Sequence, residues 1–191
     1  MNDFMKLVEE RQSCRCYDPA LRPSREQLEN CIRAAQLAPS ACNSQPWHFT
    51  IVNDPQLSPA VAQATQLYGL NKFTADCPAF IVICEQPARL LARVSGTVGS
   101  QHYAPMDVGI ATAHLCYAAT AQGLSTCIMG CFDEERLREL LPLPETGKVR
   151  LVLAIGTAAQ DPLREKKTQA AGRDLHLCRR ITPFQKQQWR V

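Results

Sequence analysis

Short apolar runs along this chain predict strands at four places. Ala79 to Cys84 is apolar throughout. After its first residue, the segment from Lys148 to Ile155 is apolar except for Arg150. Both patterns are typical of buried strands. Trp47 to Val52 is a third predicted strand because a turn signal of Asn, Asp and Pro follows it directly. The fourth is Ser125 to Met129.

Helical signals separate these strands. Asp3 is placed to cap a short first helix, and Ser24 with Gln27 forms a capping-box signature for a second. The longest periodic segment, Pro105 to Gln122, should be the central helix; the apolar residues that share one face of it are Met106, Ile110, Ala113, Tyr117 and Ala121. Asp133 caps a last helix that reaches Leu141. This alternation predicts a mixed α and β fold, with helices covering a sheet of four or five strands.

Length and composition favour a single domain over residues 1–191. Of the 191 residues, 46% are hydrophobic and 20% are charged, which excludes disorder along the whole length. The N-terminus lacks the layout of a secretory signal, and the apolar runs are far shorter than the roughly 20 residues that span a bilayer. We therefore expect a soluble, cytoplasmic protein that does not enter a membrane.

Positive charge is concentrated in a basic C-terminal arm. The net charge is +3, but residues 163–191 contain eight lysines or arginines against two acids. Such an arm is most often solvated, although it can also bind nucleic acid, a membrane or the phosphate of a small cofactor. The net charge is too small to argue for nucleic acid by itself, and we expect no nucleic-acid partner.

The first candidate site follows the first helix. In the extended stretch Arg11-Gln12-Ser13-Cys14-Arg15, residues 11, 13 and 15 emerge on one face. Two guanidiniums and a hydroxyl on one face match the geometry of a phosphate dianion. The alternative is a surface arginine pair around a polar turn.

The second candidate is the loop from Ala38 to Pro46. Its prolines stiffen it, and its small polar residues present donors and acceptors that could read a planar heterocycle. It is longer than the roughly 4–6 residues of an ordinary connection, which is the alternative interpretation. Gly130, between a predicted strand and a helix cap, is a weaker third candidate because glycine lets the backbone approach a ligand closely.

Several well-known site patterns are missing from the sequence. No G-x-G-x-x-G follows a strand, and no G-x-x-x-x-G-K-[ST] occurs, so Rossmann-type dinucleotide binding and P-loop chemistry are not supported. The four histidines are scattered, and the cysteine pairs 14/16 and 127/131 are at most half of a metal site. We expect no metal.

Taken together and in this order, the three segments resemble the nitroreductase family of flavin mononucleotide (FMN) enzymes. Arg11, Ser13 and Arg15 match its Arg-x-Ser-x-Arg/Lys motif. Its Ala-Pro-Ser-x-x-Asn-x-Gln-Pro-Trp motif is matched by Ala38, Pro39, Ser40, Asn43, Gln45, Pro46 and Trp47. The later matches are Asp107, Gly109, Ala121, Gly123, Leu124, Gly130, Phe132, Asp133 and Gly156.

The resemblance implies an α+β, nitroreductase-like fold, with a mixed four- to five-stranded sheet flanked by helices, in an interlocked homodimer. FMN would bind at the subunit interface, with its phosphate held near the first motif and its ring reached by the loop of the other subunit. The cofactor-binding residues expected from this resemblance are Arg11, Gln12, Ser13, Arg15, Pro39, Ser40, Asn43, Asp107, Ile128, Met129, Gly130, Arg164, Lys166 and Lys167.

The activity implied is a two-step shuttle. NADH or NADPH delivers hydride to FMN, and an electron-poor acceptor such as a nitroaromatic or a quinone then takes it from the same face. No catalytic nucleophile is needed, and Arg15 would give electrostatic support to the reduced ring. Two alternatives are another flavin reaction on this fold, such as dehalogenation or dehydrogenation, and a flavin- or redox-sensing binding module.

Ten cysteines are unusually many for a chain of this length. Cys31, Cys84 and Cys116 fall in helix or strand patterns and should be small core residues. The cysteines expected around the flavin site are Cys14, Cys16, Cys42, Cys127 and Cys131.

Overall fold

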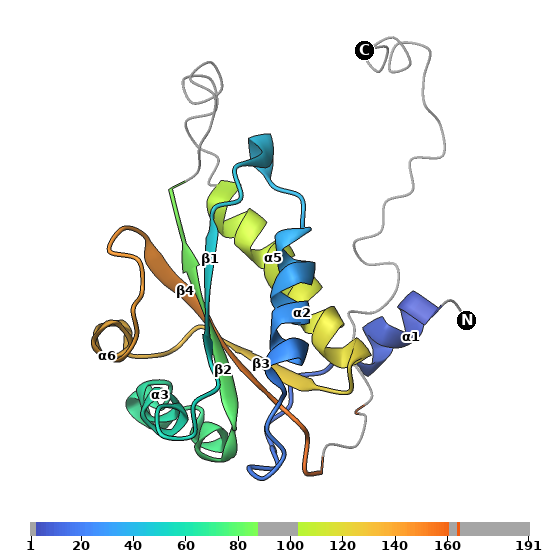
Figure 1. Cartoon of the computed structure of the whole chain (residues 1–191), viewed down its shortest axis with the longest axis vertical. Coiled ribbons are helices and arrows are strands. Elements are labelled where there is room, and N and C mark those ends of the chain that lie inside the picture. The colour runs from blue at the N-terminus through green and yellow to red at the C-terminus, as the bar shows by residue number, and fades with distance from the viewer. Residues whose placement is uncertain (1–2, 88–102, 161–163, 165–191) are drawn as a thin grey trace, which may run out of the picture.

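A four-stranded antiparallel sheet forms the centre of the structure (Figure 1). The computed structural model describes residues 3–87, 103–160 and 164. The strands lie in the order β1-β2-β4-β3, with the bounds β1 Trp47–Val52, β2 Ala79–Glu85, β4 Lys148–Gly156 and β3 Ser125–Met129. β2 and β4 are the two inner strands, which explains why their sequences are almost continuously apolar.

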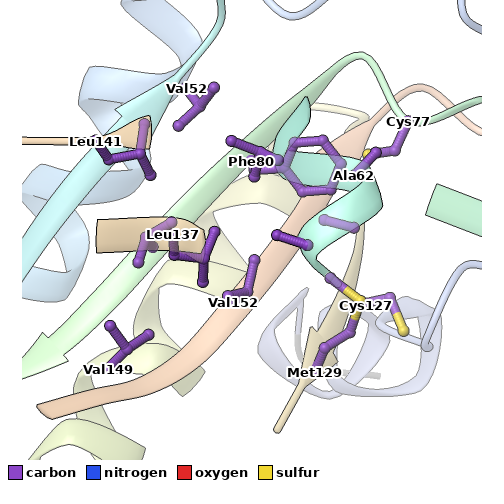
Figure 2. Packing of buried hydrophobic residues seen from close by; sticks show 14 of the residues in the cluster. Val52, Ala62, Cys77, Phe80, Cys127, Met129, Leu137, Leu141, Val149 and Val152 are labelled. Atoms are coloured by element: carbon purple, nitrogen blue, oxygen red, sulfur yellow. The ribbon is translucent and has the colours of Figure 1, made fainter. Parts of the chain in front are cut away.

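Helices cover both faces of this sheet. On one face lie α2 (Arg25–Gln36) and α5 (Tyr103–Ala121), whose buried side chains pack against Ile81, Ile83 and Leu153. On the other face lie α3 (Ser58–Ala64) and α6 (Glu134–Leu140). Figure 2 shows this second core, where Phe80 and Val152 of the sheet contact side chains such as Leu137 of α6. The alternation of side chains along β2 and β4 therefore supplies two separate hydrophobic clusters.

The helix caps predicted at Ser24 and Asp133 are confirmed, whereas Asp3, expected to cap the first helix, is itself helical, and the central helix expected from Pro105 already includes Tyr103. Ser24 accepts from the Gln27 backbone N–H at 3.1 Å, and the Gln27 side chain accepts from the Ser24 N–H at 2.9 Å, so the capping box is complete. Asp133 caps α6 through the Arg136 N–H at 2.9 Å. The first helix, α1, spans Asp3–Glu10.

The central helix α5 presents its predicted apolar face outward. The side chains that face the sheet are instead those of Val108, Ala111, Leu115, Cys116 and Ala119. Met106 is 49% exposed and Ile110 is 40% exposed. A cavity of about 440 Å³ lies over this outer face; it is lined by Phe4, Leu7, Ala34, Ile110, Ala113, His114, Tyr117, Ala118 and Ala121. A helix that is apolar on all sides is usually buried on all sides, and the described residues of one chain leave the outer face of α5 partly uncovered.

The fold class predicted from the sequence is confirmed as α+β, with four strands in the described residues. All three ladders between them are antiparallel, and the parallel component of the expected mixed sheet is limited to one isolated bridge between Ser13 and Thr126. No helix in the described ranges is long and apolar enough to cross a membrane. The basic arm lies outside the described residues except for Arg164.

Candidate functional site

The stretch after α1 pairs with β3 and with the chain just beyond β4. The Cys14 N–H donates to Thr126 O of β3 at 2.9 Å, and Ser13 and Thr126 form the parallel bridge. Further along, Tyr17 pairs with Ala158 just beyond β4, and its buried hydroxyl donates to Ala154 O at 3.2 Å. These bonds extend the stretch beside the edge strand and fix the direction of its side chains.

Positive charge converges on the first half of β3. Burial raises the pKa of the Cys127 thiol, and the opposing effects come from Arg15, a hydrogen bond with Ser13, Arg11 and Arg164, in that order. Three side chains from residues 11–15 and one from residue 164 therefore act on one thiol. Arg11 and Ser13 are half-buried, whereas Arg15 and Arg164 are exposed. Together they form a cluster that we call the arginine cradle: Arg11, Ser13, Arg15 and Arg164.

Gln12 connects this cradle to the C-terminal arm. Its Oε1 accepts from the Arg164 backbone N–H at 3.1 Å and from Arg164 Nε at 3.3 Å. The Arg164 guanidinium also donates to the Ser13 carbonyl oxygen. The Gln12 side chain thus binds Arg164, the cation that the sequence placed at the phosphate. The direct contact between Gln12 and a cofactor stays a prediction. Lys166 and Lys167 lie outside the described residues.

The end of β3 offers backbone rather than side chains. The Met129 side chain is 3% exposed and packs in the core, while Ile128 is 41% exposed and Gly130 is exposed. A Cβ at Gly130 would meet nothing within 4 Å among the described residues. The open side of Gly130 leaves its backbone accessible to a ligand.

The loop of the second candidate is strained and strongly hydrogen-bonded. Cys42, Asn43 and Gln45 have positive φ values of 53°, 51° and 47°, which side-chain-bearing residues rarely adopt. Ser40 Oγ accepts from the Gln45 N–H at 3.0 Å, and Gln45 Nε2 donates to Asn43 Oδ1 at 3.1 Å. Backbone strain of this kind gathers at ligand-binding sites, where the surrounding structure maintains it.

Asp107 is buried beneath this loop, at 5% exposure, and its Oδ2 accepts from the Ala41 N–H at 3.1 Å. The sequence placed Asp107 among the cofactor-binding residues. In the structure its described partner is the loop backbone, while Pro39 and Asn43 are exposed and Ser40 is half-buried.

The loop after α2 and helix α1 lie toward opposite ends of α5 (Figure 1). The loop is bonded to Asp107 near the start of the helix, whereas α1, which leads into the cradle, packs Phe4 against Tyr117, with ring centroids 5.8 Å apart. Asp107 and Tyr117 are about 15 Å apart along the helix axis at a rise of 1.5 Å per residue. The described part of one chain therefore does not bring the two predicted halves of the site together.

Sequence reasoning missed the turn that includes Tyr68 and Asn71. Asn71 is left-handed with φ 52°, and its Nδ2 donates to Thr65 O at 3.0 Å and to Cys131 O at 3.2 Å. Tyr68 is also left-handed, with φ 58°, and is 87% exposed. The hydrogen bond from Asn71 to Cys131 O thus attaches this turn to the chain just after Gly130. The signal was Gly and Asn close together, which tolerate this conformation.

The cysteines divide differently from the prediction. Cys31, Cys84 and Cys116 are buried as expected, but Cys14 and Cys127, placed around the ligand site, are also buried, at 0% and 3% exposure. The extended stretch turns Cys14 inward because its neighbours Ser13 and Arg15 face out. Of the five cysteines expected at the site, Cys16 and Cys42 are exposed and Cys131 is half-buried.

Comparison with known proteins identifies the fold and the motifs. Residues 8–157 match the family described as the Nitroreductase family. The chain belongs to the nitroreductase family. It is an oxidoreductase by this membership.

Relatives of this nitroreductase-family chain are found across bacteria and archaea. A protein of Archaeoglobus fulgidus, provisionally named NADH dehydrogenase/NAD(P)H nitroreductase, is 31% identical over 160 residues, which cover 82% of this chain and 86% of that protein. The oxygen-insensitive NADPH nitroreductase of Helicobacter pylori is 26% identical and covers 86% and 93% of the two chains. Among solved structures, an FMN-dependent nitroreductase of Clostridium difficile superposes with a TM-score of 0.71 at 21% identity, covering 91% and 98%.

Proposed function

We propose that this protein is an FMN-dependent oxidoreductase that passes hydride from NADH or NADPH to an electron-poor acceptor such as a nitroaromatic or a quinone. The observation that carries the proposal is the arginine cradle: Arg164 donates to the Ser13 carbonyl oxygen, and the charges of Arg11, Arg15 and Arg164 all act on the Cys127 thiol of β3. Such a set suits a phosphate dianion. The relatives named NAD(P)H nitroreductase and the FMN-dependent structural neighbour support the same assignment.

The residues of one chain suit the phosphate end of FMN and one edge of its ring. Arg11, Ser13 and Arg164 would hold the phosphate, with Lys166 and Lys167 as further proposed contacts from the arm. Arg15, exposed at the far end of the cradle, would favour negative charge on the ring. Bound FMN supplies the hydride-transfer chemistry, so the chain itself needs only to bind, orient and stabilise charge.

The ring end of the proposed site needs a second copy of the chain. The loop that carries Pro39, Ser40 and Asn43 is bonded to Asp107, about 15 Å along α5 from Tyr117, against which α1 packs. A homodimer that buries the outer apolar face of α5 would cover that face and could bring one chain's loop to the other chain's cradle. The proposed unit is therefore a homodimer with FMN at the interface.

The test is the absorption spectrum of the purified protein, before and after anaerobic addition of NADH or NADPH, with the chain mass in solution measured on the same sample. We expect flavin bands that bleach on reduction, and return when a quinone or nitroaromatic is added. The double variant Arg11→Ala/Ser13→Ala should bind FMN at least tenfold more weakly, whereas Arg25→Ala, which removes an exposed arginine paired with Glu29, should bind it normally. A protein that neither contains nor binds FMN contradicts the proposal.

A redox-sensing module receives less support from the thiols. A sensor requires an exposed thiol of low pKa. The described thiols with a shifted pKa all shift upward because of burial: Cys31, Cys77, Cys84, Cys116 and Cys127. Rapid oxidation of NAD(P)H with an acceptor would separate the enzyme from the sensor.

A further inference from the structure

Asp107 is the only charged side chain among the buried residues that the structure describes. A buried carboxylate is costly unless donors satisfy it. Its hydrogen-bond donor is the Ala41 N–H at 3.1 Å, and within residues 3–87 and 103–160 no ion pair involves Asp107. A carboxyl group retained in the core beside one backbone amide indicates that the position of that amide matters.

The amide belongs to the strained part of the loop. Ala41 begins the short 3₁₀ turn η1 (Ala41–Asn43), in which Cys42 and Asn43 are left-handed. The hydrogen bonds of Ser40, Asn43 and Gln45 to one another lie within the loop and cannot fix it to the rest of the molecule. Among the described residues, two hydrogen bonds join the loop to segments distant in the sequence: Ala41 N–H to Asp107, and Gln86 N–H to Pro46 O at 3.0 Å. Asp107 therefore anchors the half of the loop that carries Ser40 and Asn43.

The helix turn that contains Asp107 also carries the uncovered face of α5. Asp107 points inward to the loop, while Met106 and Ile110 point outward at 49% and 40% exposure. Because both sides belong to one rigid helix turn, the position of the loop is coupled to the position of the proposed dimer interface.

We propose that Asp107 is a positioning residue for the flavin ring: its carboxylate, by holding the Ala41 N–H, keeps Ser40 and Asn43 where they meet the FMN of a second copy, without itself touching FMN. The inference rests on the proposed function, because the ligand and the second copy come from it. It replaces the direct cofactor contact that the sequence suggested for Asp107.

Three variants of α5 test the role of the carboxylate. Asp107→Leu is similar in volume and cannot accept a hydrogen bond, whereas Asp107→Asn retains an amide oxygen that can. The matched control is Thr112→Val on the same helix, which removes a buried hydroxyl bonded only within the helix, to Val108 O at 2.7 Å. The dissociation constant of FMN is measured by quenching of flavin fluorescence with each apoprotein, beside its melting temperature.

We expect Asp107→Leu to weaken FMN binding at least tenfold, equal to about 1.4 kcal/mol, and Asp107→Asn and Thr112→Val to stay within about threefold of the original chain. Loss of FMN binding in Asp107→Asn equal to that in Asp107→Leu would overturn the proposal, since the charge and not the hydrogen bond would then be needed. Equal binding by Asp107→Leu and Thr112→Val would also overturn it.

Removing the donor provides a test that leaves Asp107 in place and applies even if Asp107→Leu does not fold. Ala41→Pro deletes the N–H at the first position of η1, where proline is tolerated because the preceding residue, Ser40, is extended with ψ 153°. Ala41→Ser, which keeps the N–H, is the control. We expect Ala41→Pro to weaken FMN binding as Asp107→Leu does, and Ala41→Ser to leave it unchanged. Unchanged binding by Ala41→Pro overturns the inference, whereas absence of FMN binding by the original chain overturns the proposed function itself.

Discussion

The turn before β4 leaves no room for a side chain at Gly147. Its φ is +106°, and a Cβ there would overlap the carbonyl oxygen of Glu85 and lie 2.8 Å from Gln86 Nε2. The backbone of Glu85 belongs to β2 and cannot retreat as the end of a flexible side chain could. We therefore predict that Gly147→Ala displaces the turn from the end of β2.

The size of the effect follows from what the displacement breaks. A left-handed alanine costs roughly 1–2 kcal/mol. Two hydrogen bonds of 2.9 Å cross the junction, from Gln86 Nε2 to Thr146 O and from Arg138 Nη2 to Gly147 O, and each contributes about 1 kcal/mol. The total is about 3–4 kcal/mol, which corresponds to a fall of roughly 6–16 °C in melting temperature for a chain of this size.

Gly123→Ala is the matched control, because Gly123 also has a positive φ, +74°, but its Cβ would meet nothing within 4 Å. It should lose only the conformational part, about 1–2 kcal/mol. Both variants are compared with the original chain by urea unfolding at one fixed protein concentration, since association alters apparent stability. Equal losses in the two variants would refute the reasoning, because the clash with Glu85 would then contribute nothing.

Two further predictions concern the buried thiols and the outer face of α5. Burial raises the pKa of Cys31 to about 11 and that of Cys77 to about 12 from an ordinary 9.0, so the folded chain keeps these thiols neutral while the unfolded chain ionises them. Stability should therefore be lost as the pH rises above 9, by about 1.4 kcal/mol per pH unit for each such thiol, and Cys77→Ala should reduce that slope; an unchanged slope would contradict the assignment. Ile110→Lys should convert the proposed dimer to monomer in size-exclusion chromatography with light scattering, whereas Leu21→Lys, at a residue that is 51% exposed, should not; a dimeric Ile110→Lys would exclude this face as the interface.

Local signals predicted most of the elements. The strands Trp47–Val52 and Ser125–Met129 have the predicted bounds, because a turn signal or a helix end limits each of them. The capping residues Ser24 and Asp133 also mark helix starts in the structure, since a side chain that satisfies free N–H groups acts within one turn. Information of this kind lies within a few residues and can be read without the fold.

Features that depend on distant partners were not predictable. The sequence pattern of α5 is apolar on more than one face, so periodicity alone could not decide which face meets the sheet. The inward turn of Cys14 depends on its pairing with Thr126, more than a hundred residues away. Gln12 holds Arg164, and Asp107 holds Ala41, through contacts that no local motif encodes.

The family motifs also required the fold before their relation could be understood. Arg11, Ser13 and Arg15 are brought to β3 by the chain itself, and Arg164 joins them through Gln12 and Ser13. The loop is held at the other end of α5, about 15 Å along the helix from the turn that supports α1. Two groups fixed to one rigid helix keep their separation and cannot close around a ligand by bending of the chain. In the proposed dimer the cradle of one copy and the loop of the other share one flavin, and the apolar outer face of the same helix is where the described surface best suits the second copy.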